Sequence, residues 1–334
     1  MGEPWIAASA TELLAGATDR VAIDPGDGKS GSRFARVTVD GDRFVVKALS
    51  RDGDWITRVM HDPSFWNLQV WRAGVMGAVP PEIDHAVVGM AIDGDGDEAV
   101  LTMLMRDVGE HLVPEGDAAV TREQHLSLID GLAALSARFW GWADDLDLCP
   151  MANRVRFFAP DNIAPELDGT PPDEVPVPLR VAAEGWARLP ELAPRLADVL
   201  FALHADPAPL VAALAETPAT FLQGDWKMGN LGVHPDGRTI LLDWAYPGAG
   251  PCCWDLAWYL ALNRARLPIS KEDTITAFRR RLEDRGIATA GWFDQQLSLA
   301  LLGMAATIGW EKAVGDEAEL RWWESAALAG AARL

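Results

Sequence analysis

The chain's most informative stretch is Gln223-Gly224-Asp225-Trp226-Lys227-Met228-Gly229-Asn230, which Asp243 follows thirteen residues later. Between these two features, residues 231–234 and 239–242 are strand-like, and the turn residues Pro235-Asp236-Gly237-Arg238 separate them. The pattern predicts a β-hairpin. Its open end would bring Asn230 and Asp243 side by side.

The side chains at this open end suit phosphoryl-transfer chemistry. One carboxylate and one amide oxygen in contact fit a hard cation such as Mg²⁺, which completes its octahedron with phosphate and water. We therefore predict Asn230 and Asp243 as metal ligands. Asp225 precedes them on the loop, where a carboxylate can orient a hydroxyl and accept its proton. The alternative is that three common turn residues merely flank a surface hairpin.

At these residues the sequence resembles the aminoglycoside phosphotransferase and choline kinase family, small-molecule relatives of the protein kinases. The catalytic loop of that family reads H-G-D-x-x-x-x-N, and its metal-binding Asp precedes a Trp, as in Leu242-Asp243-Trp244. The resemblance implies that Asp225 is the catalytic base and that Asn230 and Asp243 bind Mg²⁺. It extends to Asp255, where the family has a similar structural Asp.

Two residues depart from the family pattern. Gln223 stands where the family usually has His, and we expect this change to alter the support of the loop more than the chemistry. Ala245 stands where many relatives have Glu, which removes a second acidic group near the metal. Lys227 follows the base by two residues, as in protein kinases, and is a catalytic candidate that could reach the γ-phosphate. The alternative for Lys227 is an exposed loop lysine.

The resemblance implies an α+β, two-lobed protein-kinase-like fold, with a small β-rich N-terminal lobe and a larger helical C-terminal lobe that carries the catalytic-loop hairpin. We expect residues 1–105 to form the nucleotide-binding lobe and residues 106–334 the catalytic and acceptor-binding lobe. Strands are predicted in the first part at 20–23, 33–39, 43–49, 86–92 and 99–105, with a helix at 62–76. The second part has helical patterns at 121–139, 179–215, 253–263, 270–285 and 292–334, and a proline-dense loop or insertion at 160–178.

Lys47 is the predicted phosphate-binding lysine. Strand alternation places it on the same face as Val45 and Leu49, and a lysine on an apolar face needs an anion. Taken alone, such a lysine is more often one that extends to solvent at a sheet edge. Kinases pair this lysine with a helix glutamate, but residues 62–76 contain none, so Gln69 is the expected substitute.

The glycine-rich stretch at 24–32 supplies Gly28, Ser30 and Gly31 as further nucleotide contacts, because backbone N–H groups of such a turn can cover phosphates. A Walker A loop is disfavoured, since Ile23 occupies the position of its first glycine and the chain after Ser30 is strand-like. A plain hairpin loop remains the alternative.

The base of ATP or GTP is expected to lie against the strand that ends near residue 105. Met105 would line the back of the pocket, and the backbones of Arg106 and Val108 would meet the base, as the family hinge does. Trp226 is expected to be a packing residue that could also stack on a ring of the acceptor.

Composition excludes several classes of protein. The net charge of −20 repels nucleic acid and anionic lipid surfaces. The longest apolar run, 297–310, is shorter than the roughly 20 residues of a membrane span, and no signal peptide is visible, so we expect no membrane association and a cytoplasmic location. Three cysteines and six histidines show neither a disulfide framework nor zinc-ligand spacing.

The expected activity is transfer of the γ-phosphate of ATP or GTP to a hydroxyl of a small molecule. Residues 145–222 carry 12 acidic and 5 basic residues, which favours a neutral or cationic acceptor such as an amino sugar, an aminoglycoside-like molecule or an amino alcohol. The alternative is a nucleotide-binding pseudokinase that acts as an interaction module. A kinase acting on protein is disfavoured, because only eleven residues separate Asp243 from Asp255, too few for an activation loop.

Overall fold

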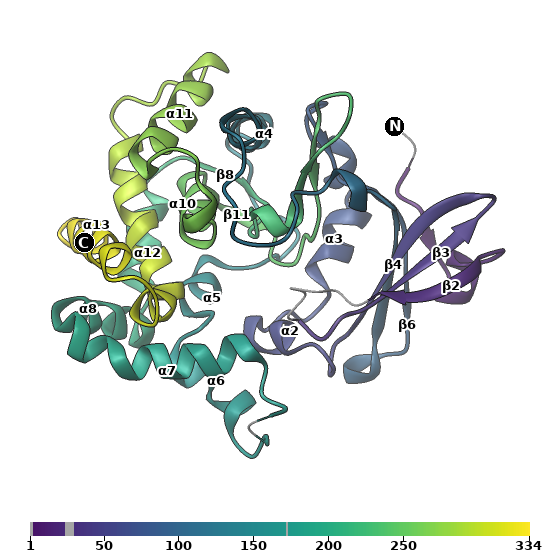
Figure 1. Ribbon diagram of the computed structural model, residues 1–334, viewed down its shortest axis with the longest axis horizontal. Coiled ribbons are helices and arrows are strands. Elements are labelled where there is room, and N and C mark those ends of the chain that lie inside the picture. Colours follow the sequence, from purple (N-terminus) through teal and green to yellow (C-terminus); the bar gives the residue numbers. More distant parts are fainter. Residues whose placement is uncertain (1–2, 24–29, 172) are drawn as a thin grey trace.

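The N-terminal lobe is built on a twisted sheet. The computed structural model describes residues 3–23, 30–171 and 173–334. Within these residues a six-stranded sheet has the order β1-β6-β7-β4-β3-β2, seen edge-on at the right of Figure 1. Its strands are β1 (Ile6–Ala7), β2 (Thr18–Ile23), β3 (Arg33–Val39), β4 (Asp42–Ser50), β6 (Val87–Asp93) and β7 (Val100–Arg106).

Strand alternation gives this sheet two different faces. Val37, Val46 and Leu104 pack on one face against the short helix α1 (Ala10–Leu13). Leu49 and Met103 belong to the main core on the other face. Lys47 alternates with Val46 and lies opposite Met103 in the ladder, so it shares the core face, which is the face directed at the C-terminal lobe.

The helical region that follows β4 differs from the prediction of one helix at 62–76. It contains two short helices, α2 (Trp55–Met60) and α3 (Trp66–Arg72). The N-cap of α3 is Phe65, whose side chain makes no capping hydrogen bond, although Asp62 Oδ2 accepts a hydrogen bond from the Trp66 N–H at 2.8 Å. The helix nevertheless begins at Trp66, since the intervening Pro63, Ser64 and Phe65 form a turn, with Phe65 at φ +55°.

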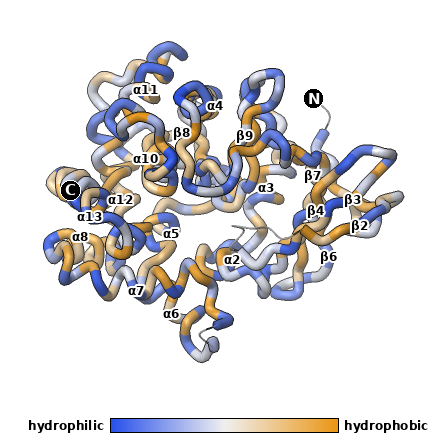
Figure 2. Tube along the Cα trace, viewed as in Figure 1, coloured by the Kyte–Doolittle hydropathy of each residue, from blue (hydrophilic) through white to orange (hydrophobic). Residues whose placement is uncertain are grey.

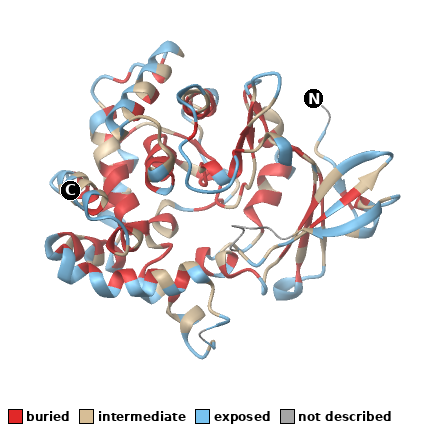
Figure 3. Cartoon of the chain, viewed as in Figure 1, coloured by how far each residue is buried: buried red, intermediate tan, exposed pale blue. Residues whose placement is uncertain are grey.

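The C-terminal lobe is helical, as predicted. Its helices are α4 (Arg122–Arg138), α5 (Met151–Arg156), α6 (Pro160–Leu167), α7 (Val177–Leu192), α8 (Pro194–Ala205), α9 (Ala208–Ala215), α10 (Cys253–Leu262), α11 (Lys271–Asp284), α12 (Phe293–Ala313) and α13 (Glu317–Ala331). The central helices α10 and α12 are mostly buried, and the exposed, hydrophilic residues lie on the outer elements (Figures 2 and 3). No single described helix is long and apolar enough to span a bilayer, although the consecutive pair α8 and α9, bent by 85°, meets the criteria together.

The expectation of a loop at 160–178 is wrong for its first half. Helix α6 begins at Pro160 and runs to Leu167. Proline is tolerated in the first turn of a helix, where its missing N–H has no partner to lose. Helix α6 packs against α2 of the other lobe, where Glu166 accepts two hydrogen bonds from Arg58, at 2.7 Å and 2.6 Å.

Two small sheets carry the loop 223–230 and the segment 242–247. Strands β9 (Leu231–Val233) and β10 (Thr239–Leu241) form the predicted hairpin, and β5 (Ile83–Asp84) adds to β10 in parallel. Strand β8 (Ala219–Leu222) precedes the loop 223–230 and pairs with β11 (Gly248–Pro251), which follows the segment 242–247. The loop 223–230 and the segment 242–247 are therefore fixed at both ends by strands. The exact boundary between the lobes, placed at residue 105, stays a prediction.

Candidate active site

The loop after β8 is shaped by Gly224. Its φ is +91°, and a Cβ at this position would lie 2.2 Å from the Tyr246 carbonyl oxygen. Only glycine fits such a close approach of two backbones. The turn directs the next residue, Asp225, into the interior of the site, where the side chain is 1% exposed.

Three donors hold the carboxylate of Asp225. Asn230 Nδ2 donates to its Oδ2 at 2.7 Å, and the indole N–H of Trp258 donates to its Oδ1 at 2.8 Å. The ammonium of Lys227 lies 3.0 Å from Oδ2. Donors on both oxygens fix the plane of a carboxylate. A hydroxyl that enters the site would meet a base of defined orientation.

The amide nitrogen of Asn230 is bound to Asp225. Its Nδ2 donates to both the carboxylate and the backbone carbonyl of Asp225, at 2.7 Å and 3.0 Å. The carbonyl oxygen is then the atom of this side chain that remains for a cation. In the hairpin, the Leu242 N–H donates to the Asn230 carbonyl at 2.9 Å, so Asp243 follows directly after the residue opposite Asn230. The backbones of Asn230 and Asp243 are therefore close at the open end of the hairpin, and their joint binding of a metal stays a prediction.

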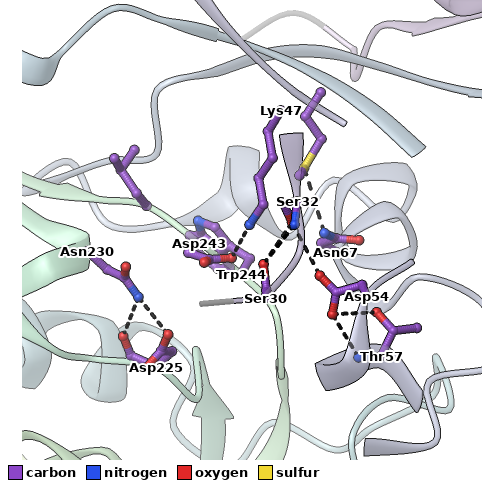
Figure 4. A network of polar contacts seen from close by, with 12 residues as sticks. Ser30, Ser32, Lys47, Asp54, Thr57, Asn67, Asp225, Asn230, Asp243 and Trp244 are labelled. Carbon is purple, nitrogen blue, oxygen red and sulfur yellow. Dashed lines mark hydrogen bonds and ion pairs between the residues drawn. The ribbon is translucent and has the colours of Figure 1, made fainter. Parts of the chain in front are cut away.

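Asp243 pairs with Lys47 across the two lobes. Lys47 Nζ lies 2.8 Å from Asp243 Oδ1, and the lysine is 6% exposed (Figure 4). Burial alone would raise the pKa of Asp243, but the charge and hydrogen bond of Lys47, together with Lys227, lower it below its ordinary value. The expected partner of Lys47 was wrong: Gln69 instead donates to the Ser64 carbonyl at 3.1 Å.

The side chain of Gln223 supports the loop through hydrogen bonds to backbone groups. Its Oε1 accepts from the Asp225 N–H at 2.8 Å, and its Nε2 donates to the carbonyls of Leu242, at 3.1 Å, and Asp243. One neutral side chain therefore joins the loop of the base to the strand end that carries the carboxylate of Asp243. This is the supporting role that the sequence indicated for Gln223.

The carboxylate of Asp255 is hydrogen-bonded to the same loop. Its Oδ2 accepts from the N–H groups of Gln223 and Gly224, at 3.0 Å and 3.3 Å. Burial, with a smaller contribution from the charge of Asp225, raises the pKa of Asp255 to about 6, against the lowering effects of Arg154 and of these two N–H groups. The site therefore contains a carboxylate whose protonation is linked to the stability of the loop.

The glycine-rich turn is described only in its second half. Gly28 lies outside the described residues. Gly31 has φ +89°, and a Cβ there would lie 2.6 Å from the Gly53 carbonyl oxygen. Ser30 Oγ lies 2.9 Å from Ser32 Oγ, which donates to Asp54 Oδ2 at 3.3 Å (Figure 4).

Of the residues expected to contact the nucleobase, only some have groups that could still bind it. Met105 is half-buried and lies opposite Val45, two residues before Lys47, so it shares the face of Lys47. The N–H of Arg106 donates to the Ala86 carbonyl at 2.9 Å, so this group is not free to meet a base. Val108 is buried.

Sequence reasoning missed two side chains of the site. Trp258 reaches Asp225 from α10, and no motif connects the two residues. Asp54 is the N-cap of α2, in a region for which the sequence predicts no helix. The option that Trp226 stacks on an acceptor is wrong, because Trp226 is 0% exposed.

The donor set fits Mg²⁺ and does not fit zinc. Asp243 and Asn230 offer hard oxygen atoms, which Mg²⁺ prefers. Among the described residues no group of three or more His, Cys, Asp or Glu side chains is placed to hold a metal. A cation held by one carboxylate and one amide would need oxygens from phosphate and water to complete its shell.

Comparison with known proteins identifies the fold. No protein-family model and no curated protein matches the chain. Among solved structures, choline kinase LicA from Streptococcus pneumoniae has a TM-score of 0.54 at 11% identity, with 96% of each chain covered. Spectinomycin phosphotransferase APH(9)-Ia, in complex with ADP and spectinomycin, has a TM-score of 0.51 at 11% identity, and an apo form of aminoglycoside phosphotransferase APH(4)-Ia has 0.50 at 12%, each with 96% of both chains covered. The predicted two-lobed kinase-like α+β fold is therefore confirmed.

Proposed function

We propose that this chain is a Mg²⁺-dependent phosphotransferase that moves the terminal phosphate of ATP to a hydroxyl of a small molecule. The observation that carries the proposal is the grouping of Asp225, Asn230, Asp243 and Lys47 between the lobes. A base, a pair of hard oxygen ligands and a buried cation are the parts that phosphoryl transfer requires.

Each side chain has one task in this proposal. Asp225, held by Trp258 and Asn230, orients the acceptor hydroxyl and takes its proton as the oxygen attacks the terminal phosphorus and the bond to the leaving nucleoside diphosphate breaks. Lys47 binds phosphate oxygens, and Lys227 is near enough to Asp225 to reach the transferred group. Asn230 and Asp243 would hold Mg²⁺, which when bound neutralises charge between the β- and γ-phosphates.

ATP is the donor we propose. A solved structure of similar fold, the spectinomycin phosphotransferase, contains ADP. Met105, on the face of Lys47, would line the adenine pocket, and Ser30 and Gly31 would lie over the phosphates. Val108 and the carbonyl of Arg106 remain the proposed hinge contacts.

The acceptor we propose is an amine-bearing alcohol or sugar. Tyr246 is buried close to the base, and the charges of Asp225, Asp243 and Asp54, after burial, raise the pKa of its phenol. Its ring lies 5.4 Å from that of Phe157 and 6.2 Å from that of Trp258, centroid to centroid. These rings pack against one another and are almost fully buried, so the proposal rests on the negative charge of the neighbouring carboxylates, which attracts an ammonium group. The similar structures include a choline kinase and a spectinomycin phosphotransferase.

Nucleotide consumption by the purified protein tests the proposal. The protein is incubated with ATP and Mg²⁺ and offered amino alcohols, amino sugars, aminoglycosides and plain sugars in turn. We expect acceptor-dependent formation of ADP, with no turnover in Asp225→Ala. Nucleotide binding without turnover on any acceptor would favour the pseudokinase alternative, and equal turnover in Asp225→Ala would refute the assigned site.

A further inference from the structure

Asp54 is a buried carboxylate at the phosphate end of the cleft that the proposed mechanism does not use. Its Oδ1 accepts from the N–H and the Oγ1 of Thr57, at 3.0 Å and 3.4 Å, and so caps α2. A cap needs one acceptor oxygen, which Asn or Ser supplies as well as Asp. Asp54 is 1% exposed, however, and burying a charge is unfavourable unless other groups compensate it. Capping alone does not explain this residue.

The second oxygen of Asp54 faces the glycine-rich turn. Ser32 Oγ donates to Oδ2 at 3.3 Å, and Ser32 Oγ in turn lies 2.9 Å from Ser30 Oγ. Figure 4 shows the two serines between Asp54 and the pair formed by Lys47 and Asp243. Asp54 therefore connects the start of α2 to the chain that would cover the phosphates.

The charges of Lys47 and Asp243 reach Asp54. Burial raises the pKa of Asp54, the Thr57 N–H and the ammonium of Lys47 lower it, and the carboxylate of Asp243 raises it. Lys47 thus interacts with two carboxylates, one in direct contact and one at longer range.

Binding of a cation would change the partner of Lys47. The lysine is bound to Asp243 Oδ1 at 2.8 Å, but a divalent cation on the same carboxylate would repel the ammonium. With 6% exposure Lys47 cannot be solvated in place. The charges of Lys47 and Asp54 already interact, so Asp54 is a carboxylate to which the ammonium can turn when Asp243 holds the cation.

We propose that Asp54 is a positioning residue of the nucleotide site, which takes over Lys47 from Asp243 and anchors Ser30 and Ser32 over the phosphates when Mg²⁺ and nucleotide bind. Asp54 touches neither the metal nor the reacting atoms and acts through these three side chains. The inference rests on the proposed function, because it requires a cation at Asp243 and phosphates at Lys47.

The test compares Asp54→Asn with the matched control Asp316→Asn. Asp316 caps α13 by accepting from the Glu319 N–H at 3.0 Å, so both variants keep a cap and lose one charge. Unlike Asp54, Asp316 is exposed and belongs to the C-terminal helix, not to the proposed nucleotide site. Calorimetry measures the affinity for ATP with Mg²⁺ and for adenosine. We expect Asp54→Asn to bind MgATP about tenfold more weakly, the size expected for losing a charge-assisted contact, and adenosine as the wild type does.

The outcomes separate this inference from the proposed function. Unchanged MgATP affinity in Asp54→Asn, or an equal loss for adenosine, would overturn the role of Asp54 while leaving the kinase assignment standing. No nucleotide binding by the wild type would overturn both. If Asp54→Asn does not fold, Ser32→Ala decides, because it removes the partner of Oδ2 and leaves the cap intact: a severalfold loss for MgATP alone supports the anchor, and wild-type affinity refutes it.

Discussion

Lys47 and Asp243 come from different lobes, yet the ammonium of one lies 2.8 Å from the carboxylate of the other. The lysine is held on β4 by its ladder partner Met103, and Asp243 is held by the hydrogen bond from Gln223 to its carbonyl. Each side chain is therefore presented to the cleft by its own sheet or loop. A metal ion bound at Asp243 would compete with the ammonium of Lys47 for the same carboxylate.

Replacing Lys47 with methionine tests its contact with phosphate. Lys47→Met keeps the length and apolar stem of the side chain and removes the charge. A hydrogen bond to a charged group contributes about 1.5–3 kcal/mol, so we expect MgATP to bind roughly 10- to 100-fold more weakly and adenosine to bind as before. Lys271→Met is the matched control, since Lys271 forms a 2.6 Å ion pair with Glu319 outside the cleft. Equal losses for MgATP and adenosine would contradict a phosphate contact.

Replacing Asp243 with asparagine tests the metal site. Asp243 has φ +52°, a left-handed conformation that Asn tolerates well, so the backbone should be kept. In Asp243→Asn, ATP affinity without Mg²⁺ should be equal or higher, because Lys47 is released, but Mg²⁺ should no longer increase it. Titrations with and without Mg²⁺ measure this ratio in both proteins. A variant that keeps the wild-type ratio would show that the metal binds elsewhere.

Replacing Asp225 with asparagine tests the base. We expect kcat to fall about 10²- to 10⁴-fold, the usual size of general-base assistance, because the acceptor proton has no carboxylate to receive it. Asn offers one acceptor oxygen, so one contact from Trp258 or Asn230 is lost, and MgATP affinity must be measured in parallel. It should change little. Asp236→Asn, in the exposed hairpin turn, is the control, and full turnover by Asp225→Asn would remove Asp225 from the mechanism.

The catalytic hairpin was predictable because its signals are local. Turn residues and two short apolar runs specify β9 and β10, and pairing then places Asn230 next to Asp243 whatever surrounds them. Lys47 was predictable for the same reason, since the face of a strand residue follows from alternation.

What could not be predicted depends on tertiary contacts. The partner of Lys47 lies 196 residues away, and no local pattern selects Asp243 over Gln69. Helix α2 has only six residues and is stabilised by packing, with Trp55 against Phe157 of the other lobe, which propensity does not reveal. Trp258 reaches Asp225 only because the fold packs α10 against the loop that carries Asp225. Local sequence patterns therefore identified residues such as Asp225 and Asp243, whereas the contacts that position them depend on tertiary packing.

The buried Asp255 predicts a pH-dependent stability. Its pKa of about 6 in the folded protein lies above the ordinary 3.8, so between these values the native state holds a proton that the unfolded state has lost. This group's contribution is fully present below pH 3.8 and is lost as pH rises through about 6. The difference corresponds to about 3 kcal/mol.

Asp255→Asn should remove that dependence, because Asn still accepts from the N–H groups of Gln223 and Gly224. Denaturant unfolding at pH 4 and pH 7 measures the free energy of unfolding of both proteins. Relative to the wild type, the variant should gain about 2 kcal/mol between the two pH values, because at pH 4 a small part of the roughly 3 kcal/mol is already lost. The exposed Asp117→Asn serves as control, and parallel pH profiles for Asp255→Asn and the wild type would show that Asp255 does not titrate as the structure indicates.

The last prediction concerns the charge of the acceptor. The segment 145–222, with a net charge of −7, contains α5 to α9, and its α6 packs against α2 of the N-terminal lobe. Asp161 in this segment is paired with Arg156, whereas Asp173 and Glu174 are exposed, so they are the acidic side chains we expect to act on an approaching amine. That action is long-range and is weakened by salt.

For an acceptor that carries an amine, we therefore expect the KM to rise severalfold as ionic strength goes from about 0.01 to 0.15 M, where the Debye length falls from roughly 30 to 8 Å. A neutral sugar acceptor measured under the same conditions is the control, and its KM should stay constant because it has no charge to screen. The double variant Asp173→Asn, Glu174→Gln should reduce the salt dependence without changing kcat, since neither residue touches the base. A KM that does not respond to salt, or a preference for a sugar acid, would contradict electrostatic attraction of the acceptor and would leave the phosphoryl-transfer proposal to be judged on Asp225 and Asp243 alone.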